Sequence, residues 1–211
     1  MCIRDRSQLP RFQTKEATGL LEEHLAKQLD SPDALALDVL AASRNLKTAP
    51  RGLAAFEANV SMQKYGEFSF ALSGGSPTRG ERIYKTHVSA QCIRCHDAGG
   101  KGKQAGPELP GIAKKGRAYL LEALVDPSAT IAKGFESVSI LKENGKLISG
   151  TVISETDEII TLGRADGKSV TIRKGEIDDR SDAKLSAMPK MTEVLSASEI
   201  RDLVEYLSTL Q

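Results

Sequence analysis

The 211-residue chain has no tryptophan, and aromatic residues make up only 4% of it. This is a thin supply for a large self-sufficient core, because aromatic side chains bury the most apolar area. The chain also lacks any run of about 18 apolar residues, so we expect no transmembrane segment in it. The formal net charge is only +1, so composition gives no reason to expect a nucleic-acid partner.

Cysteine is scarce too: besides Cys2, the chain has only the pair in the stretch Cys92-Ile93-Arg94-Cys95-His96. A zinc site needs about four ligands, usually from two such pairs, and neither His24 nor His87 has the spacing of a second pair. A redox dithiol normally opens a helix after a strand, and nothing strand-like precedes Cys92. Both alternatives stay open, but neither is favoured.

The spacing of the motif favours covalent haem attachment. On a helical turn, positions i, i+3 and i+4 lie on one face, so Cys92, Cys95 and His96 point the same way. The two sulfurs can form thioethers with the vinyl groups of one haem while the His96 ring reaches the iron. The pattern is typical of c-type haem attachment.

Other residues are candidates to complete such a site. A metal-ligating histidine normally donates its second ring N–H to an acceptor, and the Pro107 carbonyl is our candidate for His96. A methionine thioether in the sixth position of haem iron raises the reduction potential. Met188 is the leading candidate, because Pro189 would stiffen the segment that presents it. Met191 is the rival, and plain core packing remains a third reading.

The first 72 residues divide into two parts. The first six could be encoded by a transposase adapter used in sequencing libraries, so we expect residues 1–7 to be an artefact and exclude them from the fold. The absence of a signal peptide then says nothing about location. Residues 8–72 carry apolar residues at helical spacing. This spacing predicts a helix at 14–29, a second that follows the break at 30–32 and continues to about 45, and a third at 51–62. They resemble the end of an α-helical repeat array.

The sequence predicts a helix near each end of the range 73–211. Ser76 and Pro77 suit the start of a helix that carries Gly80 and Tyr84. A second helix is expected at 117–125. The C-terminal helix opens with a capping box at residues 196–199, and its apolar stripe needs a partner. The Gly80/Tyr84 helix is the best candidate.

Between these helices the hydrophobic period changes to two. Apolar residues alternate on either side of Asn144-Gly145 and again around Asp166-Gly167, which predicts two hairpins. We therefore expect a small β module of four to five strands, inserted at about 135–180. The predicted fold class is mainly α, with this insertion.

The order of parts resembles class I cytochrome c, and more closely the haem-binding domain of the planctomycete/verrucomicrobial type. The resemblance covers residues 73–211, about two-thirds of the chain. It is carried by Ala90-Gln91-Cys92-Ile93-Arg94-Cys95-His96, Gly106-Pro107-Glu108-Leu109, Tyr119-Leu120-Leu121-Glu122-Ala123-Leu124-Val125-Asp126-Pro127-Ser128, Gly134-Phe135-Glu136 and Ser186-Ala187-Met188-Pro189.

The resemblance implies a cytochrome c-type helical fold with one haem c, bound covalently through Cys92 and Cys95. His96 and Met188 would be the axial ligands, and the function would be electron transfer rather than catalysis. The implied partner is another redox protein or an upstream dehydrogenase-like domain, in a periplasmic or cell-surface protein. Two alternatives stay open: a peroxidase-like haem enzyme with a labile sixth ligand, and a binding module whose β insertion docks a partner.

Overall fold

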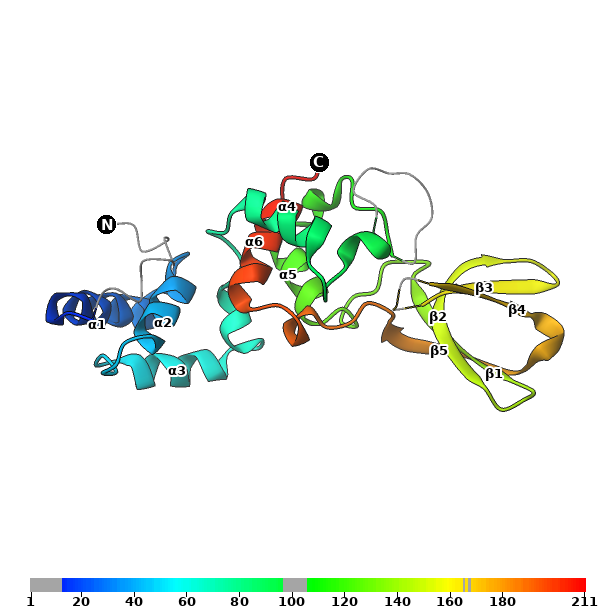
Figure 1. Ribbon diagram of the computed structural model, residues 1–211, viewed down its shortest axis with the longest axis horizontal. Helices are drawn as coiled ribbons and strands as arrows, with labels where there is room; N and C mark the ends of the chain where they lie inside the picture. Colours follow the sequence, from blue (N-terminus) through cyan, green and yellow to red (C-terminus); the bar gives the residue numbers. More distant parts are fainter. Residues whose placement is uncertain (1–12, 97–105, 165, 167) are drawn as a thin grey trace.

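The computed structural model describes residues 13–96, 106–164, 166 and 168–211. The artefact expected at residues 1–7 lies outside the described residues. Figure 1 shows three regions in a row: the N-terminal helices, a central helical region that includes the C-terminus, and a β-sheet. In the described ranges, no helix combines the length and the apolar character that crossing a membrane requires.

The described secondary structure consists of α-helices, β-strands and short 3₁₀ turns. The helices are α1 (Lys15–Asp30), α2 (Ala36–Arg44), α3 (Leu53–Met62), α4 (Pro77–Thr86), α5 (Arg117–Val125) and α6 (Ala197–Leu207). The 3₁₀ turns are η2 (Gly66–Phe70), η3 (Cys92–Arg94), η4 (Ile112–Lys115), η5 (Lys174–Glu176) and η6 (Met191–Glu193). The strands are β1 (Glu136–Lys142), β2 (Leu147–Glu155), β3 (Ile159–Gly163), β4 (Ser169–Arg173) and β5 (Ile177–Ser186).

Helices α1, α2 and α3 share their own apolar core, in which Leu25, Val39 and Phe56 are fully buried. A buried ion pair joins this group to the central region. The guanidinium of Arg201 on α6 donates from both terminal nitrogens to the two oxygens of Asp38 on α2, at 2.9 Å each. Helix α6 is therefore fixed from the side of the N-terminal helices.

The predicted pairing of α4 with α6 is confirmed. Ser76 accepts a hydrogen bond from the backbone of Arg79, so it caps α4 as expected. A Cβ at Gly80 would clash with the backbone of Asp202, so the absence of a side chain lets the two helices touch. The rings of Tyr84 and Tyr206 lie 5.6 Å apart at this crossing. The capping box between Ser196 and Glu199 is also present.

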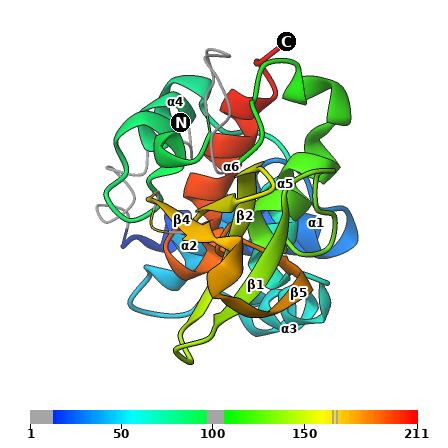
Figure 2. The same ribbon diagram turned by 90° about the vertical axis from the view of Figure 1, so that its right-hand side faces the viewer.

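The sheet has five antiparallel strands in the order β4-β3-β2-β1-β5. Gly145 adopts a φ of +77° in the β1–β2 turn. A short hairpin loop needs a residue with positive φ, and glycine adopts it without strain. The sheet buries its own core, formed by Val138, Ile140, Ile160, Leu162 and Ile172. In Figure 2 the viewer looks onto the sheet from its end of the molecule.

The predicted fold class, a mainly α protein with a small inserted β module, is wrong. The sheet is a sizable module with a separate core, and it runs on to Ser186 instead of ending near 180. Strand β5 has a polar, exposed middle at residues 178–182, so it shows no apolar alternation. It joins the sheet through its backbone pairing with β1. The described chain combines helices and a sheet as substantial parts.

Candidate functional site

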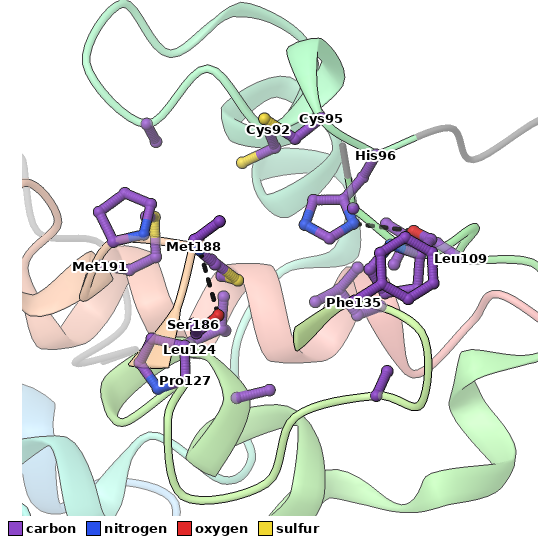
Figure 3. A pocket seen from close by; sticks show the side chains of 18 of the residues that line it. Cys92, Cys95, His96, Leu109, Leu124, Pro127, Phe135, Ser186, Met188 and Met191 are labelled. Carbon is purple, nitrogen blue, oxygen red and sulfur yellow. Dashed lines mark hydrogen bonds between the residues drawn. The ribbon is translucent and has the colours of Figure 1, made fainter. Parts of the chain in front are cut away.

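The motif that begins at Cys92 follows a tight turn after α4. Cys92 opens the 3₁₀ turn η3, and the backbone N–H groups of Cys95 and His96 both donate to the Cys92 carbonyl, at 3.2 and 2.9 Å. Gln91, just before the turn, has a φ of +46°, which is uncommon for a residue with a side chain. Strain of this kind persists where the surrounding structure enforces it. Both thiols and the His96 ring line one cavity, shown in Figure 3.

His96 is held from several directions. Its Nδ1 lies 2.9 Å from the Pro107 carbonyl oxygen, the acceptor proposed from the sequence. The hydroxyl of the buried Tyr84 donates to the His96 backbone carbonyl at 2.8 Å. Gly106 packs flat against the ring, where a Cβ would come within 2.6 Å of Cε1. These contacts leave the ring little freedom to turn.

The contacts of His96 also determine its protonation. Burial lowers its pKa, and the hydrogen bond to Pro107 opposes that shift only in part. The ring is therefore neutral at pH 7. Because a carbonyl only accepts, Nδ1 carries the proton, and the lone pair lies on Nε2. A neutral imidazole with a free Nε2 is the form that ligates a metal.

The two thiols are poorly suited to redox chemistry. Burial raises the pKa of Cys92 to about 11. Burial also raises the pKa of Cys95, with Arg94 opposing the shift and Asp166 adding to it. Reactive dithiols have lowered pKa values, since the thiolate is the nucleophile. The electrostatics therefore weigh against the dithiol alternative.

The remaining histidines lie elsewhere. His24 belongs to α1. His87 directly follows α4, and its Nδ1 accepts a hydrogen bond from the Ala90 backbone N–H. Neither lines the cavity around His96. The structure brings no second ligand pair to the cysteines within the described residues, as the zinc alternative would require.

Met188 lies two residues beyond the end of β5 and lines the same cavity as His96. In Figure 3 its side chain extends into the space beside the His96 ring. Met191 also lines the cavity, but it opens η6, is only 2% exposed and belongs to the central apolar core. Of the two methionines, Met188 is the less committed to packing.

The cavity has walls of three kinds. One carries the cysteines and His96, a second is built by α5 and α6, and the third comes from the sheet and its connections. Residues from the third wall are Phe135, Thr151, Arg164, Ser186, Ala187, Met188 and Pro189. The sheet thus takes part in the site.

These residues fit a flat apolar group with anionic substituents, as haem is. Most of the lining is apolar, and the ionised side chains among the described lining residues are Arg94 and Arg164. Thr151 is 2% exposed, and its hydroxyl has no hydrogen-bond partner among the described residues. The donor set, two thiols with a neutral imidazole and a thioether, is the set that a covalent six-coordinate haem uses.

Several residues have roles at the site that the sequence did not predict. Gly106 and the Tyr84 hydroxyl hold His96, while Ser186 and Ser128 hold the segment of Met188. A serine two residues before a candidate ligand could have indicated a local turn. The hydrogen bond between Ser128 and Ser186 joins residues 58 positions apart, so no local sequence pattern could have indicated it.

Comparisons with known proteins add no assignment. No protein-family model matches the sequence, and the search of curated proteins gives no match either.

Proposed function

We propose that this chain binds one haem c through thioethers to Cys92 and Cys95 and that it transfers electrons. In this proposal His96 and Met188 would hold the iron. The observation that carries it is the shared cavity: both thiols, the free Nε2 of His96 and the Met188 side chain line it. In the sequence, His96 precedes the five strands and Met188 follows them, and both residues line the cavity.

The family resemblance supports the same proposal. The motifs that resemble class I cytochrome c and the planctomycete/verrucomicrobial haem-binding domain include Cys92 to His96 and Met188-Pro189, and both stretches meet at this cavity. The resemblance therefore rests on residues that lie together in space. It covers the site and the helices around it.

Each residue has a defined task in this proposal. When bound, haem supplies an iron that cycles between the ferrous and ferric states. His96 presents Nε2, while Pro107 fixes the ring orientation and makes the imidazole more basic. The Met188 thioether would favour the reduced state of the iron, and the apolar lining from α5 and α6 would keep water away.

The partner and the location follow from the same proposal. Bacteria attach haem c outside the cytoplasmic membrane, so we place the protein in the periplasm or at the cell surface. The electron partner is another redox protein or an upstream dehydrogenase-like domain. Both statements depend on the resemblance.

The first experiment tests covalent attachment. The chain would be exported in a bacterium that attaches haem c, and haem would be followed through denaturing electrophoresis. We expect one haem per chain in the wild type, and loss of denaturation-resistant haem when both Cys92→Ala and Cys95→Ala are present. Exposed Ser154→Ala serves as a matched control. A wild type that releases all its haem on denaturation would overturn the proposal.

The second experiment tests the sixth ligand by optical spectroscopy. A thioether bound to ferric haem gives a weak charge-transfer band at the red end of the visible spectrum. We expect this band in the wild type and in Met191→Ala, and its loss in Met188→Ala. A high-spin ferric wild type would instead favour a peroxidase-like enzyme with an open sixth position.

A further inference from the structure

The segment that presents Met188 is held by two serines. The Met188 backbone N–H donates to the Ser186 hydroxyl at 3.1 Å. The Ser186 backbone N–H donates in turn to the Ser128 hydroxyl, also at 3.1 Å. Ser128 lies just after the end of α5, beyond Asp126-Pro127. Two hydrogen bonds thus connect the end of α5 to the backbone of Met188.

Ser186 lies where the two connections between helices and sheet run side by side. It is the last residue of β5 and pairs with Glu136, the first residue of β1. The regular pairing shifts directly after this point, between Glu136 and Ser137. Residues 127–135, which lead into β1, supply much of the cavity wall. Ser186 therefore joins the sheet, the end of α5 and the Met188 segment.

A methionine ligand needs such support. Its side chain is unbranched and flexible, so the orientation of its sulfur depends on how firmly its backbone is held. The Ser186 hydroxyl accepts from the amide two residues further on, which closes a local turn. Ala187, between them, contributes no side-chain hydrogen bond. Met188 and Ser186 are both half-buried, so water competes only in part for these groups.

We propose that Ser186 is a positioning residue for Met188, and that the sheet sets the position of the sixth ligand through Ser128 and Ser186. This inference rests on the proposed function, since it assigns Met188 to the iron. It gives the sheet a definite role: the last strand places the ligand that the helical part cannot reach by itself.

The test compares single substitutions in the haem-loaded full chain. Ser186→Ala removes the acceptor for the Met188 N–H, and Ser128→Ala removes the acceptor for the Ser186 N–H. Ser181→Ala is the matched control, because Ser181 lies exposed on the same strand opposite Ser139, outside the cavity lining. Ser186→Thr keeps a hydroxyl at the critical position.

The first readout is carbon monoxide binding to the ferrous protein, which requires Met188 to leave the iron. We expect Ser186→Ala to bind carbon monoxide about fivefold faster than the wild type, the factor that corresponds to one net hydrogen bond. Ser128→Ala changes in the same direction by less. Ser181→Ala and Ser186→Thr stay within about twofold of the wild type.

The second readout is hydrogen exchange at the Met188 amide, measured by NMR. Exchange should become faster in Ser186→Ala and stay unchanged in Ser181→Ala. A role limited to general stability would shift the melting temperature without changing carbon monoxide binding selectively.

The failures of the two proposals are distinguishable. A wild type without the thioether band contradicts the assignment of Met188 as ligand. A wild type with the band, in which Ser186→Ala binds carbon monoxide and exchanges its amide as Ser181→Ala does, overturns the role of Ser186. Ser186→Thr behaving as Ser186→Ala would overturn it too, because the hydroxyl would then be irrelevant.

Discussion

The wall of the cavity that carries His96 and the wall that carries Met188 are built differently. His96 lies among helices, and its ring and backbone are held by Pro107, Gly106 and Tyr84. Met188 follows a strand end, and its segment is held by two serine hydroxyls. His96 and Met188 are both half-buried, and both Cys92 and Met188 pack against the central apolar core, so the two walls differ in how their residues are held and not in burial.

This difference indicates a division of labour. In the proposed haem site one ligand has to stay in place, and the local contacts of His96 would supply that ligand. The Met188 wall depends on how the sheet is attached to the helices, so it is the adjustable side. Substitutions should therefore cost more stability on the His96 side and change ligation more readily on the Met188 side.

The largest effect is expected from the ion pair that joins α6, part of the α5–α6 wall, to α2. Helix α6 carries Leu203 and Leu207 in the cavity wall, and it is fixed to α2 by Arg201 and Asp38, which are 2% and 1% exposed. Arg201→Met removes both hydrogen bonds that Arg201 donates to the buried Asp38 carboxylate. We expect the free energy of unfolding to fall by about 3–5 kcal/mol in denaturant titrations.

Two controls sharpen this prediction. The double variant Arg201→Met/Asp38→Leu should recover most of the loss, because a buried pair can be replaced by apolar side chains. Arg180→Met removes an exposed pair with Glu155 on the sheet and should cost less than about 1 kcal/mol. If Arg201→Met and Arg180→Met lost equal amounts of unfolding free energy, the expected contrast between the helical part and the sheet would be contradicted.

A smaller effect is expected where the backbone meets the His96 ring. A Cβ at Gly106 would lie 2.6 Å from Cε1 and 2.9 Å from Nδ1 of His96. We expect Gly106→Ala to cost about 1–3 kcal/mol of unfolding free energy and to disturb the hydrogen bond to Pro107. Gly175→Ala is the control on the sheet side, where a Cβ meets nothing within 4 Å. NMR of the His96 ring nitrogens would report the disturbed hydrogen bond.

The same contrast explains how much the sequence could predict. Cys92, Cys95, His96 and Pro107 lie within a short stretch, so spacing and local chemistry were enough to place them together. The hairpin turn at Asn144-Gly145 and the helix caps at Ser76 and Ser196 are local signals as well. Each was located correctly.

What sequence reasoning missed depends on contacts between distant residues. Strand β5 is recruited by backbone pairing with β1, although its side chains look like those of a solvated loop. No local pattern in the sequence indicates that Asp38 is buried, because its partner Arg201 lies 163 positions away. Ser128 and Ser186 lie in two separate motifs of the resemblance, and nothing in either motif predicts the hydrogen bond between them. The fold class was wrong because the size of the sheet depends on such pairing.

A still smaller effect is expected from the hydroxyl of Tyr84, which donates to the His96 carbonyl at 2.8 Å. Tyr84→Phe keeps the ring contact with Tyr206 and removes this donor. The expected loss is about 1 kcal/mol of unfolding free energy. Tyr206→Phe is the matched control, since its hydroxyl has no hydrogen bond to another described residue. If both variants unfold alike, the hydroxyl of Tyr84 does not support the His96 wall.

The smallest effect concerns pH and the ion pair between Arg117 on α5 and Glu205 on α6. Hydrogen bonds from Arg117 hold the pKa of Glu205 below its ordinary value, against the opposing effect of burial. The folded state therefore binds the proton less readily than the unfolded state. The stabilising contribution is complete above the unfolded pKa of about 4.3, and it is lost as the pH falls through the lower folded pKa.

Glu155 on the sheet offers the counterpart, because hydrogen bonds from Lys174 and Arg180 lower its pKa as well. The Glu155 side chain is 29% exposed, whereas that of Glu205 is 20% exposed. Between neutral and acidic pH, denaturant titrations should show that the wild type loses more unfolding free energy than Glu205→Gln does, by less than about 1 kcal/mol. Glu155→Gln should change the profile less. A larger change in Glu155→Gln would mean that the exposed sheet, and not the helical wall, carries the stronger charge coupling.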